Sequence, residues 1–128
     1  DKLPDLLPKC DWLVLACPYT KETHQLVNAK TLALMPKHAH LINVARGGCA
    51  DEKALIAALQ SKQIAGAYLD VFEKEPLPAD SPLWDIPNVI VSPHNASASA
   101  GNDNRAAAIF TENLKLYAAG KPMVNEQG

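Results

Sequence analysis

The stretch that decides the fold is Ala67-Tyr-Leu-Asp-Val-Phe-Glu-Lys-Glu-Pro-Leu-Pro78. Its first six residues are apolar apart from Asp70, and their aromatic and branched side chains are typical of a buried strand. From Glu73 onward the stretch becomes acidic and proline-rich, so the strand ends there and a loop begins. Ligands of open α/β sheets bind beyond the carboxyl ends of parallel strands. We therefore expect Asp70 and Glu75 to lie at such an end, close to partners from other strands.

Apolar segments alternate with helical patterns along the whole chain. Strands are expected at 12–17, 40–44, 64–72 and 88–92, and the first, a continuous apolar run, is expected to be buried on both faces. Helices are expected after caps at Asn28 and Asp51, and over 99–119 with Gly120 as the stop. Short connections predict parallel pairing with right-handed crossovers. The expected fold class is α/β: the C-terminal half of a doubly wound Rossmann-type parallel sheet plus a long C-terminal helix.

Composition and net charge argue against some classes of binding partner. The chain has 128 residues, of which 48% are hydrophobic and 20% charged, as in an ordinary globular domain. Its formal charge of −2 argues against nucleic acid and anionic membranes as partners. Three cysteines without C-x-x-C spacing indicate reduced thiols in a cytoplasmic protein. Because the chain begins at Asp1 and not at a methionine, we expect a fragment of a longer protein.

Polar side chains follow three of the expected strands. Arg46 follows the second strand in a flexible turn with two glycines, Asp70 and Glu75 follow the third, and His94 follows the fourth. An arginine binds a carboxylate through two hydrogen bonds, and a histidine beside a carboxylate is a suitable acid/base near neutral pH. Together they suit a 2-oxo acid, whose carbonyl needs a proton as it accepts a hydride. Spacing alone does not choose between Glu73 and Glu75 as the acid, because residues two apart share a face of an extended chain.

Four motifs then occur in a fixed order. They are I-N-V-A-R-G-G-x-x-D-E-x-A-L (42–55), A-G-A-Y-L-D-V-F-E-K-E-P-L-P (65–78), S-P-L-W (81–84) and P-N-V-I-V-S-P-H (87–94). In this order the chain resembles the D-isomer-specific 2-hydroxyacid dehydrogenases, and within them the glyoxylate/hydroxypyruvate reductase-like branch. The resemblance runs from Leu6 to about Tyr117.

The resemblance implies a role for each polar side chain. Arg46 corresponds to the substrate-binding arginine, His94 to the acid/base, and Glu75, directly before the proline, to the carboxylate partner of His94. Asp70 corresponds to a residue near the nicotinamide carboxamide. The cofactor-binding positions that the resemblance implies, for NAD or NADP, are Cys17, Pro18, Val44, Ala45, Arg46, Asp70 and His94.

The resemblance also implies an activity and a domain organisation. The activity is hydride transfer between NAD(P) and a small 2-oxo or D-2-hydroxy acid, mainly the reduction of glyoxylate- or hydroxypyruvate-like substrates, by a cytoplasmic homodimer. Residues 1–95 correspond to the C-terminal part of the NAD(P)-binding domain, and residues 96–128 to a long helix and tail that lead back toward a substrate domain.

Two other functions stay open on the same scaffold: a non-catalytic, dinucleotide-sensing regulator similar to corepressors, and a formate or phosphite dehydrogenase.

No G-x-G-x-x-G occurs in the 128 residues, so the phosphate-binding turn and the residue that selects NAD or NADP are absent from the sequence. We therefore expect negligible turnover from this chain alone. No metal site is expected, because His38 and His40 lack a third ligand.

Overall fold

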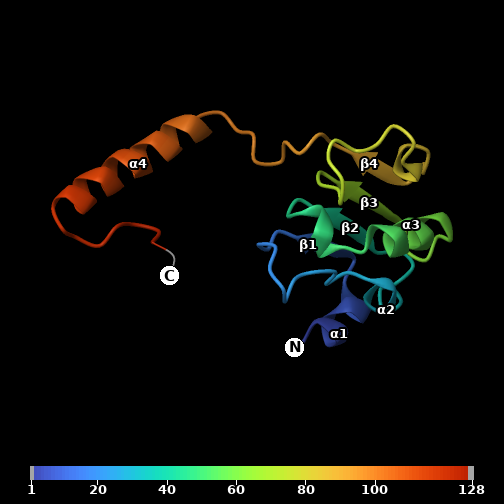
Figure 1. Ribbon diagram of the computed structural model, residues 1–128. Helices are drawn as coiled ribbons and strands as arrows, with labels where there is room; N and C mark the ends of the chain where they lie inside the picture. Colours follow the sequence, from blue (N-terminus) through green and yellow to red (C-terminus); the bar gives the residue numbers. More distant parts are fainter. Residues whose placement is uncertain (1, 127–128) are drawn as a thin grey trace. The chain divides into compact units, whose positions relative to one another are not determined.

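The computed structural model describes residues 2–126 and divides the chain into two compact units, Asp1–Ala96 and Ser97–Gly128 (Figure 1). The first unit contains the four strands and the short helices between them. The second contains the long helix α4. That the second unit leads back toward a substrate domain stays a prediction.

The first unit is built on one four-stranded sheet. Its strands are β1 (Trp12–Leu15), β2 (His40–Asn43), β3 (Gly66–Leu69) and β4 (Val89–Val91). They are all parallel and pair in the order β1-β2-β3-β4, so their carboxyl ends share one edge (Figure 1). This confirms the predicted Rossmann-type parallel sheet. The strands are shorter than predicted because the pairing ends before the polar turns begin.

Short helices join the strands. They are α1 (Leu3–Leu6), the 3₁₀ helix η1 (Leu7–Lys9), α2 (Ala29–Leu32), the 3₁₀ helix η2 (Gly47–Cys49), α3 (Glu52–Gln60) and the 3₁₀ helix η3 (Pro82–Trp84). Both predicted caps are confirmed, although α2 is only a single turn. The Asn28 side chain accepts hydrogen bonds from the backbone N–H groups of Lys30 and Thr31, and Asp51 accepts one from Ala54 N at 3.0 Å.

One face of the sheet is covered and the other is open within this unit. Consecutive strands are neighbours, so right-handed crossovers place α2 and α3 on the same face, where the two helices contact each other. Leu41 and Leu69 point toward that face and are 0% and 2% exposed, whereas Trp12 and Val14 of β1 are 60% and 54% exposed. The prediction that β1 is buried on both faces is therefore wrong: β1 is an edge strand with one open face. Its Trp12 ring stacks on His40, with ring centroids 4.4 Å apart.

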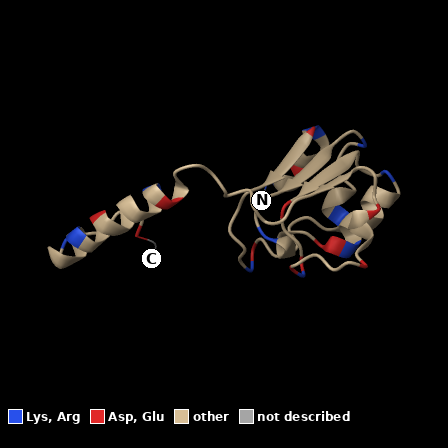
Figure 2. Ribbon diagram, turned by 90° about the horizontal axis from the view of Figure 1, so that it is seen from above, with Lys and Arg blue, Asp and Glu red and all other residues tan. Residues whose placement is uncertain are grey.

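The core between the sheet and the helices is aliphatic. Its largest fully buried apolar side chains are Leu7, Val27, Leu32, Leu41, Leu55, Leu59, Ile64 and Leu83. Acidic and basic residues are instead spread over the helices and loops and do not separate by sign (Figure 2). The side of the sheet that packs against the helices is therefore mainly apolar, with Asn43 as a buried polar side chain at the end of β2.

Helix α4 (Asn102–Ala118) forms most of the second unit and is shorter than the predicted 99–119. Gly101 precedes it in the left-handed conformation (φ 79°), and Gly120 follows it with φ 63°, as predicted for the stop. Lys121 N donates to Leu116 O at 2.9 Å and closes the last turn. None of the helices within residues 2–126 has the length and apolar character needed to cross a membrane.

Candidate active site

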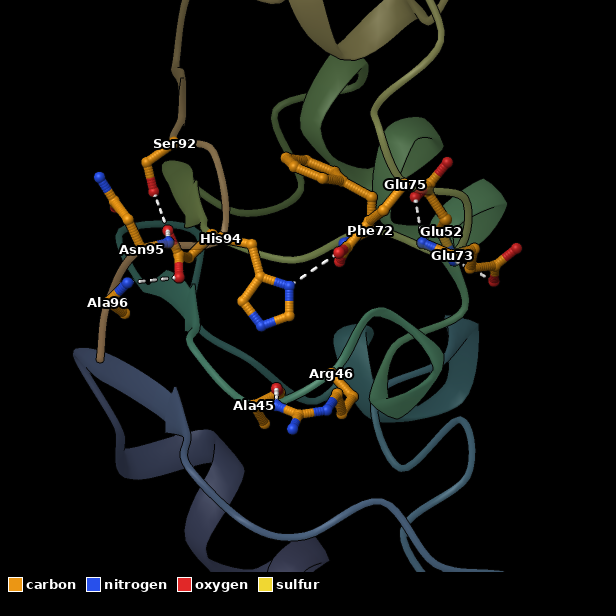
Figure 3. Close-up of polar contacts among 11 residues, drawn as sticks. Ala45, Arg46, Glu52, Phe72, Glu73, Glu75, Ser92, His94, Asn95 and Ala96 are labelled. Atoms are coloured by element: carbon orange, nitrogen blue, oxygen red, sulfur yellow. Dashed lines mark hydrogen bonds and ion pairs between the residues drawn. The ribbon is translucent and has the colours of Figure 1, made fainter. Parts of the chain in front are cut away.

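Three loops meet beyond the carboxyl ends of β2, β3 and β4 and border a cavity of about 1100 Å³. They carry Arg46, Glu75 and His94, which all line this cavity (Figure 3). The structure thus brings together the three side chains that the sequence singled out. Four other predicted positions, Cys17, Pro18, Val44 and Ala45, line the same cavity.

His94 and Glu75 form the central pair of the site. His94 Nδ1 lies 2.7 Å from Glu75 Oε2, and Glu75 Oε1 accepts a hydrogen bond from Phe72 N at 3.0 Å. The hydrogen bond with His94, followed by the one from Phe72, holds the pKa of Glu75 below its ordinary value and outweighs the opposite effect of burial. Glu75 is therefore ionised at neutral pH. His94 Nε2 has no hydrogen-bond partner among residues 2–126, and Figure 3 shows it on the side of the ring away from Glu75.

The two candidate acids of the same loop point to different partners. Glu75 contacts His94, whereas the Glu73 carboxylate accepts a hydrogen bond from Glu52 N at 3.2 Å. The structure thus distinguishes Glu75 from Glu73, which their spacing in the sequence could not do. Glu75, and not Glu73, is therefore the acid that contacts the imidazole; its role as the catalytic partner of His94 stays a prediction.

Asp70 is 1% exposed and lies beside the cavity without being among its lining residues. Its Oδ1 accepts hydrogen bonds from Asn95 N at 2.9 Å and from the Ser92 hydroxyl, and its Oδ2 accepts one from Ala96 N at 2.8 Å. Burial raises the pKa of Asp70, but these hydrogen bonds outweigh it, so the pKa lies below its ordinary value. Asp70 therefore ties the loop after β4 to the end of β3. Its role near the nicotinamide stays a prediction.

The backbone at His94 is held in an unusual conformation. Its φ is 53°, in the left-handed region that side chains with a Cβ seldom adopt. Ser92 and Asn95, on either side of it, are both bonded to Asp70, and the Tyr68 hydroxyl lies 2.8 Å from Ser92 Oγ. This network fixes the chain before and after His94, so the backbone sets the direction of the imidazole.

The backbone that carries Arg46 is fixed by Asn43, a buried polar residue at the end of β2. Asn43 Nδ2 donates to Arg46 O and Asn43 Oδ1 accepts from Ala45 N, both at 3.1 Å. The guanidinium itself donates to Ala45 O at 2.6 Å and has no ion pair within the described part of the chain. Most of its N–H donors are therefore available to an incoming anion.

The two glycines after Arg46 form the 3₁₀ turn η2, where a flexible turn was predicted. A Cβ atom on Gly47 would lie 1.9 Å from the carbonyl carbon of Phe72, and one on Gly48 would lie 2.8 Å from the Tyr19 ring. Neither glycine has a positive φ. Their function here is close packing: each lets a neighbouring segment approach the turn that carries Arg46.

Several residues of the site were not given a role from the sequence. Tyr19 and His24 line the cavity, with Tyr19 Oη 2.9 Å from His24 Nδ1, while Asn43 and Ser92 fix the two functional loops. A polar residue at the end of an apolar strand was the available signal for Asn43. Tyr19 and His24 lie in a polar loop whose sequence shows no periodicity.

A second cavity of about 700 Å³ borders the same pair from another side. It shares Phe72, Glu75 and His94 with the first cavity and is otherwise lined mainly by apolar residues: Pro76, Leu77, Trp84, Val91 and Pro93. Trp84 is anchored by a hydrogen bond from its Nε1 to Pro78 O at 2.8 Å. The pair of Glu75 and His94 therefore borders both an arginine-bearing cavity and an apolar one.

The remaining histidines and cysteines form no metal cluster in the part of the chain that the structure describes. His38 Nε2 lies 2.8 Å from Asp11 Oδ1, and His40 stacks on Trp12. The three cysteines are free thiols, and burial is the main cause that raises the pKa of Cys49.

Comparison with known proteins places this site in a family. Residues 1–96 match the family described as D-isomer specific 2-hydroxyacid dehydrogenase, NAD binding domain. Because the match covers most of the chain, the chain belongs to this family. It agrees with the parallel sheet and with the resemblance carried by the four motifs.

Named relatives are similar along nearly the whole chain. A glyoxylate/hydroxypyruvate reductase B of Escherichia fergusonii is 48% identical over 112 residues, which are 88% of this chain and 35% of that protein. A D-isomer specific 2-hydroxyacid dehydrogenase from Xanthobacter autotrophicus Py2, solved with NADPH and MES, is 48% identical with a TM-score of 0.92, over 99% of this chain and 52% of that one. An NADPH-dependent glyoxylate/hydroxypyruvate reductase from Sinorhizobium meliloti, solved with NADP and sulfate, is 35% identical with a TM-score of 0.86, over 96% of this chain and 40% of that one. The chain thus spans little more than a third of its curated relatives.

Proposed function

We propose that the protein reduces a small 2-oxo acid to the D-2-hydroxy acid with NADH or NADPH. The observation that carries this proposal is the 2.7 Å pair of His94 and Glu75 beside a cavity that also holds Arg46. An acid/base and an anion-binding group on one cavity are the two functions that the reduction of a 2-oxo acid requires of the protein. Two of the relatives reported above are named glyoxylate/hydroxypyruvate reductases, which supports the same substrate class.

The residues around the cavity fit the nicotinamide end of a dinucleotide. The segments at Cys17-Pro18 and Val44-Ala45 present small or apolar side chains and backbone groups to the cavity. A flat ring can therefore approach the backbone closely there. The bound cofactor supplies the hydride; the other steps belong to the protein's own side chains.

Arg46 binds and orients the substrate. Its available N–H groups pair with the substrate carboxylate in a bidentate arrangement, and the fixed backbone between Asn43 and Arg46 gives that pair one direction. The adjacent carbonyl is thereby directed toward His94. Holding the carbonyl in this orientation uses binding energy to lower the activation free energy of the reduction.

His94 supplies the proton. With Nδ1 bonded to Glu75, Nε2 is the atom that donates to the carbonyl oxygen as negative charge develops there. The Glu75 carboxylate holds the ring in this orientation and stabilises its charged form before the transfer. In the opposite direction His94 Nε2 accepts the proton of the 2-hydroxyl group.

The relatives favour this reading over the alternatives. Several relatives are named as glyoxylate or glyoxylate/hydroxypyruvate reductases, which argues against a dinucleotide-sensing corepressor-like regulator, and their named substrates argue against formate or phosphite. The resemblance to the family also leads us to infer a cytoplasmic homodimer, which light scattering and cell fractionation can test.

The test is a substrate and cofactor screen on the protein as its gene encodes it. Glyoxylate and hydroxypyruvate are each combined with NADH and NADPH, oxidation of the reduced cofactor is followed by its near-ultraviolet absorbance, and the product from hydroxypyruvate is analysed by chiral chromatography. We expect turnover with at least one pair and a D-configured product. No turnover with either acid and either cofactor would refute the proposal.

A further inference from the structure

Two carboxylates outside the pair of Glu75 and His94 are bonded to each other's backbone. Glu52 is the first residue of α3 and Glu73 lies in the loop after β3, 21 residues later in the sequence. Glu52 N donates to Glu73 Oε1 at 3.2 Å, and Glu73 N donates to Glu52 Oε2 at 3.1 Å (Figure 3). The two hydrogen bonds form a closed, reciprocal connection, which we call the Glu52–Glu73 clamp.

The clamp uses backbone groups that the secondary structure leaves unpaired. The first N–H groups of a helix have no partner within it, and Glu52 N is one of them. A carboxylate at this position also interacts favourably with the positive end of the helix dipole. Glu73 thus has a structural reason to point toward α3 and not toward His94.

The clamp lies beside a second contact between the same two segments. Gly47 packs directly on the backbone of Phe72 and Glu73 and leaves no room for a Cβ atom. Phe72 N is in turn a donor to Glu75 Oε1. The segment from Arg46 to the start of α3 is therefore joined to the segment that carries Glu75 at two places, through Gly47 and through the clamp.

We propose that Glu73 and Glu52 are positioning residues, whose reciprocal hydrogen bonds fix the distance between Arg46 and the pair of Glu75 and His94. The inference rests on the proposed function, because that distance must match a substrate held by its carboxylate and protonated at its carbonyl. Neither carboxylate of the clamp is bonded to Arg46 or His94 among the described residues, so the effect passes through the backbone.

The variants Glu73→Ala and Glu52→Ala each remove one acceptor of the clamp, while Glu73→Gln keeps an oxygen that accepts from Glu52 N. Lys74→Ala is the matched control: Lys74 lies between Glu73 and Glu75, is exposed, and has no side-chain hydrogen bond or ion pair within residues 2–126. All are made in the protein as its gene encodes it. The readouts are kcat and KM for glyoxylate and the titration of the Glu75 carboxyl followed by carbon NMR.

We expect Glu73→Ala and Glu52→Ala to lower kcat/KM by about 10- to 100-fold, the range that a small misplacement away from the reacting atoms produces. The pKa of Glu75 should rise toward its ordinary value, because the loop that holds its two hydrogen bonds is released. Glu73→Gln should restore most of the activity, and Lys74→Ala should stay close to wild type in both readouts.

Three results would overturn the inference. One is wild-type kinetics and an unchanged Glu75 titration in both alanine variants. Another is a Glu73→Gln variant as impaired as Glu73→Ala, which would show that the charge of Glu73 matters and not its hydrogen bond to Glu52 N. The third is a fall in melting temperature as the only effect. If the wild type itself has no turnover, the proposed function fails, and the Glu75 titration alone then decides whether the clamp positions this carboxylate.

Discussion

The turn that carries Arg46 and the turn that carries His94 leave two strands of the same sheet, yet they are held in place by different means. The Arg46 turn is held by the neutral amide of Asn43 and by steric contact, since Gly47 and Gly48 pack against Phe72 and Tyr19. The His94 turn is held by a buried charge, since the Asp70 carboxylate binds the chain on both sides of it.

The difference extends to the functional groups. The imidazole of His94 already has its carboxylate partner, whereas the guanidinium of Arg46 is bonded only to Ala45 O among the residues described. One group is therefore fixed before any ligand arrives, and the other keeps its donors for the ligand. This predicts separate kinetic consequences for the two turns.

The sharpest test of the comparison is the removal of the imidazole. We expect His94→Ala to lower kcat for the 2-oxo acid by about 10²- to 10⁴-fold, the usual contribution of a general acid, with little change in cofactor affinity. Steady-state kinetics and fluorescence titration with the reduced cofactor measure the two quantities. Wild-type kcat in this variant would show that another group supplies the proton.

The corresponding change in the other turn is Arg46→Ala. A charge-assisted hydrogen bond contributes about 1.5–3 kcal/mol, so the loss of even one should raise KM by at least about 10- to 100-fold. Arg46→Lys should recover only part of the loss, because an ammonium group does not form the bidentate pair. If KM stays unchanged in Arg46→Ala, Arg46 does not bind the substrate carboxylate.

The steric contacts of the Arg46 turn can be tested separately at the two glycines. Gly47→Ala should destabilise the protein by about 1–3 kcal/mol, because its Cβ would lie 1.9 Å from a backbone atom of Phe72, so the backbone would have to shift. Gly48→Ala should cost less, since the Tyr19 ring that it meets is 52% exposed and can turn away by giving up its contact with His24. Thermal unfolding measures both, and Tyr19→Ala should relieve only the Gly48 variant. Equal losses at the two positions would contradict the difference between backbone and side-chain contact.

The smallest expected effect is a pH dependence of stability, caused by the Asp70 carboxylate that holds the His94 turn. The pKa of Asp70 is lower in the folded state than in the unfolded chain. Its carboxylate therefore stabilises the fold above the ordinary aspartate pKa of about 3.9, and this contribution is lost as the pH falls through the folded value. Melting temperatures measured from neutral toward acid pH should fall less steeply in Asp70→Asn than in wild type or in the exposed control Asp80→Asn. Identical slopes would show that Asp70 does not link folding to pH.

Much of this arrangement could be predicted from sequence because it depends on local patterns. Alternating apolar runs and caps predicted the parallel sheet and both helix starts, the position of polar residues after the strands indicated Arg46 and His94, and the resemblance indicated Glu75. The choice between Glu73 and Glu75 could not be made from spacing, since it depends on where α3 begins in space. For the same reason, the packing function of Gly47 could not be seen, because the atoms that it meets are more than twenty residues away.

The exposure of β1 could not be predicted from the sequence either. A continuous apolar run predicts burial on both faces, but whether a face is covered depends on which elements pack there. Trp12 and Val14 show that the crossovers of this unit cover only the other face.

The two tryptophans of the chain lie near opposite edges of the sheet, Trp12 on β1 and Trp84 in η3 beside β4, and they are 60% and 53% exposed. Indole emission shifts to shorter wavelength when water is excluded from the ring, so each residue is an intrinsic optical reporter for its own edge. In the Trp84→Phe variant only Trp12 remains, and its emission reports whether the open face of β1 is covered. In the Trp12→Phe variant only Trp84 remains, and its emission reports whether the apolar cavity beside His94 is filled. Ordinary fluorimetry can therefore distinguish assembly at one edge of the sheet from ligand entry at the other.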